Sequence, residues 1–365
     1  MDQQMSVQPQ LALAVDQLAV SFHTSRGLLR AVRGVSFELH RGSTLAIVGE
    51  SGSGKSATVR TIMGLIDAQQ QIDSGHIYFH DHEGDAGQAL DLLTLSKKQR
   101  ISDINGQKIA MVFQDPMSAL NPTMSIGRQI VEAIRQHQRL GRKQSREQAI
   151  VLLEEVGIRE ARHCYKQYPH QLSGGMRQRV VIAIALACKP QILICDEPTT
   201  ALDVTMQARI LELITAIQRK HKLSILYITH DFGVVARVAD HVAVMYAGQL
   251  VEKGTVEDIF YRPLHPYTCA LLSCVPDASV SSQQLYSIPG IPPDLVQPIQ
   301  GDAFAPRNEY ALQIDFAQQP PEYRISTTHT VCSWLLHEQA PALAMNPILS
   351  ERLRQIEART ADQLA

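Results

Sequence analysis

The chain has 365 residues and a mass of 40.5 kDa, more than one hydrophobic core usually organises, so we expect at least two domains. Its 34 Lys and Arg residues balance 36 Asp and Glu residues, which excludes a strongly basic protein built to coat nucleic acid. The first ten residues lack an apolar stretch, the six cysteines include no C-x-x-C pair, and the longest apolar run, Val180 to Cys188, is shorter than the roughly 18–20 residues that cross a bilayer. We therefore expect a reduced, cytoplasmic protein that does not itself span a membrane.

The first strands are predicted to be antiparallel, and the later ones parallel. Residues 11–42 alternate between apolar and polar side chains, with Val35, Phe37 and Leu39 on one face, which is the period of a half-buried strand. Three later segments are short and almost wholly apolar: Leu45–Val48, Ile192–Cys195 and Ile225–Ile228. Strands buried on both faces have this pattern, so we predict an α/β fold with helices on both sides of a parallel sheet.

Between the first two of these strands, residues 126–156 have apolar side chains near helical spacing and predict part of an inserted helical lobe. Residues 241–251 alternate again and predict a hairpin that turns near Ala247 and Gly248. Twelve of the 18 prolines fall in residues 261–365. Because helices and central strands tolerate few prolines, we expect these residues to form a loop-rich, separately organised appendage, here called the C-terminal extension.

Residues 49–56 follow the first apolar strand and match G-x-x-x-x-G-K-S, the pattern of a phosphate-binding loop. Glycines let backbone N–H groups turn toward phosphates, the lysine adds positive charge at the β- and γ-phosphates, and the serine hydroxyl can bind Mg²⁺. A helix predicted at Ala57 to Leu65 presents its positive N-terminus to the same place. The predicted phosphate-binding residues are Gly49, Glu50, Ser51, Gly52, Ser53, Gly54, Lys55 and Ser56.

Polar residues follow the other apolar strands at the same expected edge of the sheet. Asp196 and Glu197 end the second strand, so we expect Asp196 to hold Mg²⁺ through water and Glu197 to act as the base toward the attacking water. His230 follows the third strand and is expected to donate to the γ-phosphate. Gln114 leaves a further apolar strand and can offer its amide oxygen to Mg²⁺ or to the attacking water.

A second anion site is predicted at Ser173, Gly174 and Gly175, which precede the apolar run that begins at Val180. Ser173 is expected to cap a helix, and the two glycines leave its N-terminus open. Because residues 49–56 already supply one phosphate cradle, we expect the second site to close on the γ-phosphate held by another subunit. The nucleotide would then be sandwiched in a dimer.

Together these residues resemble the ATP-binding cassette of membrane transporters over about residues 12–260. The matching motifs, in chain order, are Walker A at 49–56, the glutamine loop at Gln114, the signature at 172–175, Walker B ending at Glu197, the D-loop at 201–203 with Asp203, and the switch His230. The resemblance implies a P-loop NTPase with an antiparallel β subdomain and a helical subdomain inserted at about 115–185. It also implies ATP and Mg²⁺ as cofactors, with Mg²⁺ held by Ser56, Gln114 and Asp196. Phe22 stands where the family has an aromatic that stacks on adenine, although a core strand residue is an equally good interpretation.

A finer resemblance, to the ATPases of oligopeptide and dipeptide importers, rests on 113–122, 196–203 and the segment His265-Pro-Tyr-Thr. It implies a cassette domain at 1–260 and the family's extension at 261–365. Many relatives carry cluster-binding cysteines in that extension, but here Asp302, Asn308 and Asp315 stand at three of those places and only Cys332 remains. We therefore expect no iron–sulfur cluster and predict instead a small core around Phe304, Tyr310, Phe316 and Trp334, helped by polar contacts from the three substituted positions.

The resemblance implies an ATP-hydrolysing subunit of a peptide importer at the cytoplasmic face of a bacterial cell membrane. Its expected partners are a second, related cassette, two transmembrane permease subunits and, indirectly, an extracytoplasmic substrate-binding protein, with no nucleic acid. Import of nickel or another solute by the same mechanism stays open. A cassette ATPase of DNA repair or of ribosomes agrees less well, because Lys55 and Asp196 are 141 positions apart without a long insertion, and one cassette is present.

Overall fold

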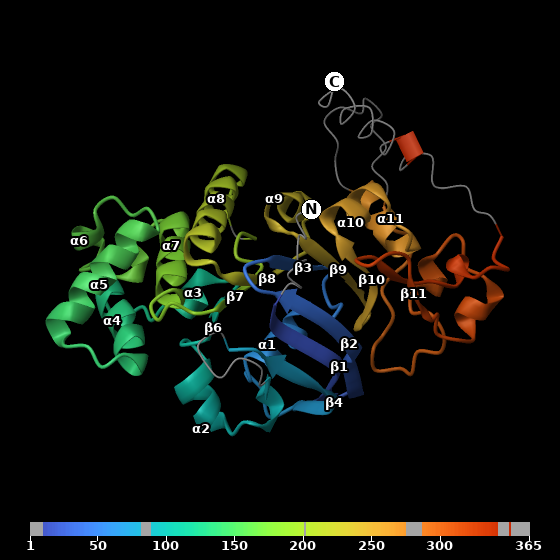
Figure 1. The fold of residues 1–365 in the computed structure, drawn as a ribbon, viewed down its shortest axis with the longest axis horizontal. Coiled ribbons are helices and arrows are strands. Elements are labelled where there is room, and N and C mark those ends of the chain that lie inside the picture. The colour runs from blue at the N-terminus through green and yellow to red at the C-terminus, as the bar shows by residue number, and fades with distance from the viewer. Residues whose placement is uncertain (1–9, 82–88, 201, 275–286, 342–349, 352–365) are drawn as a thin grey trace, which may run out of the picture.

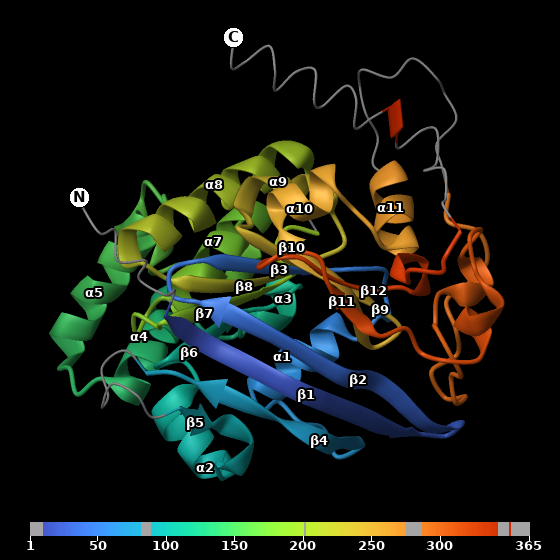
Figure 2. The same ribbon diagram turned by 45° about the vertical axis from the view of Figure 1, so that its right-hand side comes forward.

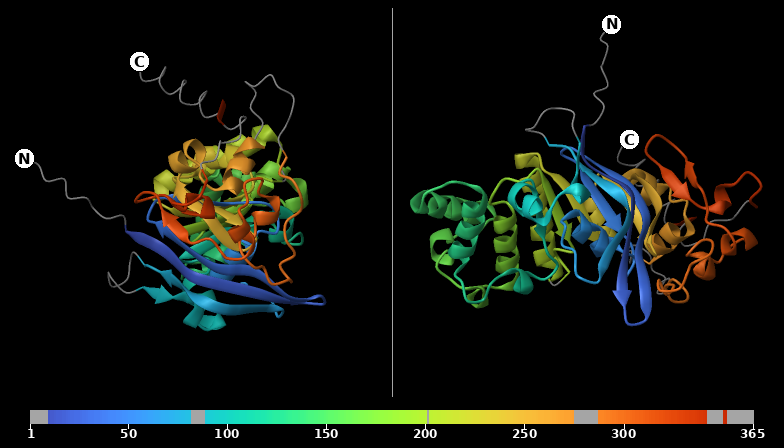
Figure 3. Two further views of the ribbon diagram at one scale, coloured as in Figure 1. Left: turned by 90° about the vertical axis from the view of Figure 1, so that its right-hand side faces the viewer. Right: turned by 90° about the horizontal axis from the view of Figure 1, so that it is seen from below.

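The computed structural model describes residues 10–81, 89–200, 202–274, 287–341 and 350–351. Figure 1 shows a helical lobe at one end, the C-terminal extension at the other, and two sheets between them. The right-hand view of Figure 3, from below, shows the same succession along the long axis of the molecule. Within the described ranges, no helix is long and apolar enough to cross a membrane.

The predicted antiparallel sheet is present in the first part of the chain. Its strands are β1 (Leu11–Thr24), β2 (Gly27–His40), β4 (Gln70–Phe79) and β5 (Leu90–Asp91), in the spatial order β2-β1-β4-β5. Val35, Phe37 and Leu39 are buried, as their alternation predicted. Figure 2 shows this sheet in front of and below the second sheet, and the apolar face between them forms one continuous core with helix α1 (Lys55–Ile62).

The second sheet has eight strands in the order β11-β12-β10-β9-β3-β8-β7-β6. They are β3 (Thr44–Val48), β6 (Ile109–Val112), β7 (Ile192–Asp196), β8 (Ser224–Thr229), β9 (His241–Tyr246), β10 (Gln249–Thr255), β11 (Glu322–Arg324) and β12 (Thr330–Cys332). The pairs β3–β8, β3–β9, β7–β8 and β6–β7 are parallel, which confirms the predicted buried parallel strands. The predicted hairpin joins β9 to β10, and Ala247 and Gly248 turn it with φ of 46° and 84°.

Helices pack against the two sheets and form the lobe at one end of the molecule. They are α1 (Lys55–Ile62), α2 (Lys97–Gln99), α3 (Pro116–Ala119), α4 (Ile126–His137), α5 (Arg142–Glu155), α6 (Ala161–Cys164), α7 (Gly174–Ala185), α8 (Val204–His221), α9 (Phe232–Val238), α10 (Val256–Tyr261) and α11 (Pro266–Ser273). Helix α1 begins two residues before the predicted Ala57, because Gly54 takes a left-handed conformation as its N-cap and lets Lys55 enter the first turn.

The stretch 126–156 is helical as predicted, but it forms two helices. Helix α4 ends at His137, where Gln138 adopts an extended conformation, and α5 begins after Gly141. Residues 138–141 are therefore a connection, and the mostly polar residues 142–147 form the first turns of α5. Ile130, Ile134 and Leu153 from the two helices pack into a core shared with α7.

The predicted separate core of the C-terminal extension is wrong. Phe304 is buried, but it packs against Tyr246 of β9 and Tyr267 of α11 with ring centroids 5.3 and 5.2 Å apart, so it belongs to a core that includes the second sheet. Phe316 is 54% exposed. Strand β12 pairs with β10, which adds the extension to the sheet itself. The burial that the extension needs is thus supplied by the sheet and not by its own few aromatic residues.

The three substituted positions make the polar contacts that were expected of them. The side-chain oxygen of Asp302 accepts from the backbone N–H of Phe304 at 2.9 Å, and that of Asn308 accepts from Tyr310 at 3.0 Å. Asp315 is buried, and its Oδ2 accepts from the backbone of Leu312 at 2.6 Å. Short polar side chains that bond to the backbone two or three residues away stabilise turns, so these positions hold the loops of the extension in shape.

Candidate functional site

The phosphate-binding loop lies between β3 and α1, and close backbone approach explains its glycines. A Cβ on Gly49 would lie 2.0 Å from the carbonyl oxygen of Met245, and one on Gly54 would lie 2.3 Å from that of Ala31. Both glycines also have positive φ, 155° and 105°. Gly52, with φ of 81°, would place a Cβ in open space. The loop therefore packs against backbone at Gly49 and Gly54 and is open at Gly52.

Lys55 and Ser56 begin α1 inside this loop. The buried Lys55 ammonium donates to the carbonyl oxygens of Gly49 at 2.7 Å and Glu50 at 2.9 Å. Burial lowers the pKa of Lys55, opposed by the carboxylates of Glu197, Asp196 and Glu50. Those carbonyls hold the ammonium over the loop, where it can meet phosphate oxygens.

The hydroxyl of Ser56 and the carboxylate of Asp196 form a pair of hard oxygen ligands. Ser56 Oγ donates to Asp196 Oδ1 at 3.0 Å, and Asp196 is buried at the end of β7. Burial raises the pKa of Asp196, and the nearby charge of Glu197 adds to that rise, while the Ser56 bond opposes it. No group of three or more His, Cys, Asp or Glu among the described residues could hold a metal. A hydroxyl and one carboxylate nevertheless fit Mg²⁺, which takes its other ligands from water and phosphates.

Glu197 is the centre of a cluster at the ends of three neighbouring strands. Its carboxylate accepts from Gln114 Nε2 at 3.1 Å and from Thr200 Oγ1 at 3.0 Å, and it contacts His230 Nδ1 at 3.1 Å. Glu197 has φ of 46°, a left-handed conformation that non-glycine residues seldom adopt and that is often found at functional sites. Three of the predicted residues therefore meet through one carboxylate, beside the Ser56–Asp196 pair.

The predicted second anion site lies on another part of the surface. Ser173 caps α7 by accepting from the backbone of Met176 at 3.4 Å, as predicted, and Gly174 and Gly175 form the first turn. None of the hydrogen bonds in the described part of the chain joins these three residues to residues 49–56. Asp203 caps α8 by accepting from Met206 at 2.9 Å, while Ala201 of the D-loop lies outside the described residues.

Phe22 lies on β1 and is partly buried against the core beneath the antiparallel sheet. Its core contacts agree with the interpretation as a strand residue, and part of its side chain stays exposed.

Three further residues of the site were not found from the sequence. Thr200 contacts Glu197, and its place in the segment 196–203 was a usable signal. Tyr267 and Arg307 contact Glu50 of the phosphate-binding loop from the C-terminal extension. They lie 217 and 257 residues from Glu50, and no local pattern could have linked them to it.

Two family models match the chain, ABC transporter at residues 32–200 and Oligopeptide/dipeptide transporter, C-terminal region, at 251–314. The oligopeptide transport ATP-binding protein OppD of Bacillus subtilis is 51% identical over 346 residues, covering 94% of each chain. The chain belongs to the ATP-binding proteins of the oligopeptide/dipeptide transporter family. Another such transport ATP-binding protein, the dipeptide protein DppD of Lactococcus lactis subsp. cremoris, is 49% identical over 96% of this chain and 98% of its own.

Solved structures share the fold of this transport ATP-binding protein. CbiO1 from Clostridium perfringens, part of the ABC transporter complex cbiONQ, is 28% identical, has a TM-score of 0.57 and covers 69% of this chain and 92% of its own. A dimeric ATP-binding cassette bound to ADP and Pi, 24% identical with a TM-score of 0.58 over 67% of this chain and 98% of its own, shares the fold. The predicted cassette fold is therefore confirmed, and this protein is an ABC-type ATPase that binds ATP.

Proposed function

We propose that this chain is the ATP-hydrolysing subunit that energises import of oligopeptides or dipeptides through a multi-subunit membrane transporter. The observation that carries the hydrolytic part is the convergence of Gln114, Thr200 and His230 on the carboxylate of Glu197, next to the phosphate-binding loop. The peptide part is supported by relatives named oligopeptide or dipeptide transport ATP-binding proteins, which match the chain over almost its whole length.

In this proposal, the loop 49–56 binds the triphosphate through its backbone N–H groups and through Lys55, whose charge opposes that of the β- and γ-phosphates. Ser56, Asp196 and Gln114 would hold Mg²⁺, which supplies positive charge to the phosphate oxygens when bound. Support comes from the Ser56–Asp196 contact at 3.0 Å, which pairs two oxygen ligands beside the loop. Phe22 would stack its exposed side on the adenine.

Glu197 would take the proton of the attacking water, since its carboxylate lies at the strand ends that flank the loop. Gln114 and Thr200 keep this carboxylate in place by donating to it. His230, whose side chain is largely exposed while it contacts Glu197, can donate to the γ-phosphate. In this proposal the residues orient the catalytic carboxylate, contact the γ-phosphate and accept a proton from water. Phosphoryl transfer to water needs these contributions from a protein.

Ser173, Gly174 and Gly175 would complete the site of a second, related cassette, with Asp203 at the same contact. This is supported by their lack of hydrogen bonds, among the described residues, to the loop of their own chain. We further propose that the pair works beneath two transmembrane permease subunits at the cytoplasmic face of the cell membrane, with an extracytoplasmic binding protein delivering the peptide. The division into a cassette at 1–260, with its helical subdomain at about 115–185, and an extension at 261–365 belongs to the same proposal.

The Glu197→Gln variant tests the hydrolytic assignment. The amide keeps the shape of the side chain but cannot accept a proton, so ATP should still bind while turnover falls by about 10²–10⁴-fold. Lys55→Ala is the matched comparison, because it should lose both binding and turnover. Equilibrium ATP binding and steady-state hydrolysis are measured on both variants in the assembled transporter. Hydrolysis by Glu197→Gln at the parental rate would refute the role of Glu197.

Transport assays with the same complex in liposomes test the substrate. ATP-dependent uptake of radiolabelled di- to pentapeptides is expected, and the Glu197→Gln complex supplies the background. Uptake of Ni²⁺ without uptake of any peptide would contradict the peptide assignment and leave the ATPase assignment standing.

A further inference from the structure

Glu50, the second residue of the phosphate-binding loop, is held by the C-terminal extension. Arg307 donates to its two carboxylate oxygens, from Nη1 at 2.6 Å and from Nη2 at 3.1 Å. The Arg307 side chain is 4% exposed, whereas that of Glu50 is 29% exposed. Two parallel bonds from a buried guanidinium fix the orientation of the carboxylate as well as its position.

Arg307 is itself held in place. Its Nε donates to the carbonyl oxygen of Pro289 at 2.8 Å, and its Nη1 also reaches the hydroxyl of Tyr246 at 3.2 Å. The guanidinium carbon lies 5.8 Å from the ring centre of Tyr246 and 6.0 Å from that of Phe304. A guanidinium with this many partners has little freedom to leave Glu50, so the contact is a built one and not a chance surface pair.

A second group of the extension contacts the backbone of the same residue. The hydroxyl of the buried Tyr267 accepts from the backbone N–H of Glu50 at 2.9 Å. The carbonyl oxygen of Glu50 in turn accepts from Lys55 Nζ at 2.9 Å. The extension thus fixes the side chain and the N–H of a residue whose carbonyl helps to position the phosphate-binding lysine.

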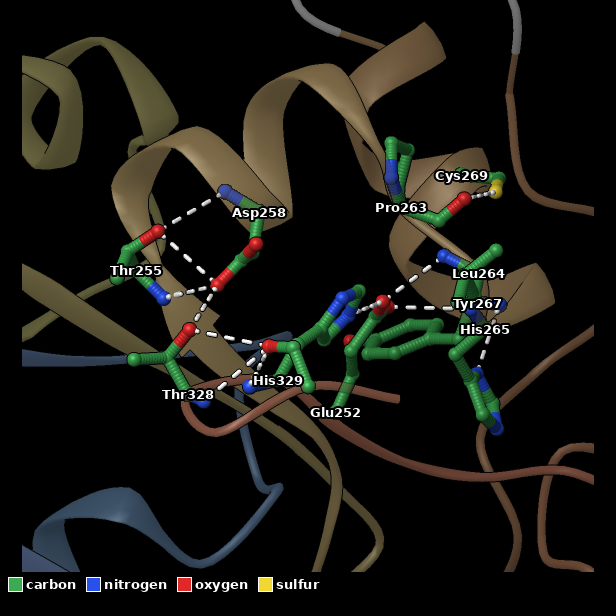
Figure 4. Close-up of polar contacts among 11 residues, drawn as sticks. Glu252, Thr255, Asp258, Pro263, Leu264, His265, Tyr267, Cys269, Thr328 and His329 are labelled. Carbon is green, nitrogen blue, oxygen red and sulfur yellow. Dashed lines mark hydrogen bonds and ion pairs between the residues drawn. The ribbon is translucent and has the colours of Figure 1, made fainter. Parts of the chain in front are cut away.

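The position of Tyr267 is secured by the buried carboxylate of Glu252, shown in Figure 4. Glu252 accepts from the backbone of Leu264 at 2.8 Å and of His265 at 3.1 Å, and it pairs with His329 at 2.8 Å. The ring of His265 then accepts from the backbone N–H of Tyr267 at 3.0 Å, and this bond caps the N-terminus of α11. Helix α11 is therefore anchored to β10 immediately before the residue that contacts the loop.

The negative charge of Glu50 bears directly on how tightly the loop binds a nucleotide. A carboxylate within a loop that receives a triphosphate repels the ligand unless its charge is balanced. Arg307 supplies that balance from the buried side, so the loop keeps a fixed conformation without presenting an uncompensated negative charge. We propose that Arg307 is a positioning residue for ATP, through which the C-terminal extension sets the affinity of the phosphate-binding loop for the nucleotide.

This role goes beyond energising transport, because it makes the extension part of the nucleotide site. It predicts that Arg307→Ala weakens ATP binding about 5-fold or more, within the usual range for coupling between two parts of a protein. Removing the repelling charge as well, in Arg307→Ala/Glu50→Gln, should restore most of the affinity.

The measurement is the equilibrium dissociation constant for ATP, made with the full chain carrying Glu197→Gln so that bound ATP stays intact. Arg26→Ala is the matched control, because Arg26 also pairs with a residue of the extension, Asp294, but does so from the β1–β2 turn. It should leave ATP affinity unchanged. In the assembled transporter with Glu197 intact, Arg307→Ala should raise KM for ATP more than it lowers kcat.

Two variants keep the proposal testable if Arg307→Ala does not fold. Tyr267→Phe keeps the buried ring and removes only the acceptor for the Glu50 N–H, and Arg307→Lys keeps the charge with a single contact. Each should weaken ATP binding with unfolding midpoints near that of the parent. Unchanged affinity in folded Arg307→Ala, or in both Tyr267→Phe and Arg307→Lys, would overturn the proposal. An Arg307→Ala/Glu50→Gln protein as weak as the single Arg307→Ala variant would also overturn it, since lost packing would then explain the effect.

Discussion

In the Glu252→Ala variant, the C-terminal extension should unfold at a lower urea concentration than the rest of the protein. The carboxylate is fully buried on β10, and its partner His329 is 3% exposed. It accepts two backbone bonds from Leu264 and His265 and one from the His329 ring. All three donors belong to the extension, whereas Glu252 belongs to the strand beside it, so one substitution removes bonds that cross between the two.

The size of the effect follows from what the substitution leaves behind. Two backbone N–H groups and an imidazole lose their acceptor, and each buried donor without a partner costs about 1–3 kcal/mol. Taken toward the low end of that range, the three donors together cost about 4 kcal/mol. With a urea dependence of about 2 kcal/mol per M, the midpoint for the extension should fall by about 2 M. Glu252→Gln should lose less stability, because the amide oxygen of glutamine can still accept a hydrogen bond from the backbone.

A single tryptophan makes the two regions separately observable. Trp334 is the only tryptophan in the chain and lies in the extension, where its indole donates to the carbonyl of Gln318 at 2.9 Å. Its fluorescence during urea titration reports the extension, while far-UV circular dichroism reports mainly the helices of the cassette. The control is Glu309→Ala, an exposed position in the extension, which should change the free energy of unfolding seen by either probe by no more than about 0.5 kcal/mol. Coincident, unshifted midpoints for Glu252→Ala by both probes would refute the reasoning.

Two other predictions concern the substituted positions of the extension. Burial raises the pKa of Asp302 from 3.8 to about 6, so its ionisation opposes folding fully above about pH 6 and not below about pH 4. Asp302→Asn should therefore stabilise the protein at pH 7.5 by about 1–2 kcal/mol. This is less than the about 3 kcal/mol that the full pKa shift corresponds to, because the group is partly exposed. Thermal unfolding should show that the gain in stability vanishes near pH 4. Asp67→Asn, an exposed change, should do neither, and an equal gain at both pH values for Asp302→Asn would contradict this cause. The other prediction is that anaerobically purified protein contains no iron–sulfur cluster, since Asn308 and Asp315 use their side-chain oxygens as turn acceptors and Cys332 is a single thiol. Analysis that found about four iron and four sulfide per chain would disprove it.

Most of the fold could be predicted because its signals are local. The strands β3, β7 and β8 are continuous apolar runs, and the turn at Ala247 and Gly248 follows from alternation on both sides of it. The break between α4 and α5 was harder to place, because Gln138 and Arg139 are polar residues that differ little from the exposed faces of the two helices.

The cluster of polar side chains around Glu197 could also be predicted in outline, because parallel strands bring their carboxyl ends to one edge. That rule was enough to bring Gln114, Glu197 and His230 together. The contact between Arg307 and Glu50 obeys no such rule, since it joins segments 257 residues apart through the packing of loops. The error over Phe304 has the same origin, because an aromatic residue in a loop-rich segment does not show from its neighbours which core will receive it.

The pairing of β12 with β10 has a consequence for how the protein is made. On the ribosome, β10 is complete at Thr255, but β12 begins only at Thr330. Because chains are synthesised at about 5–20 residues per second, the edge of β10 stays unpaired for roughly 4–15 s until β12 is made. During that time the nascent sheet presents unpaired backbone groups to other chains, and such edges favour aggregation. Chains truncated before β12 should therefore accumulate as insoluble protein, and pulse-labelling of nascent chains should find chaperones bound to those that have passed Thr255 and not yet reached Cys332.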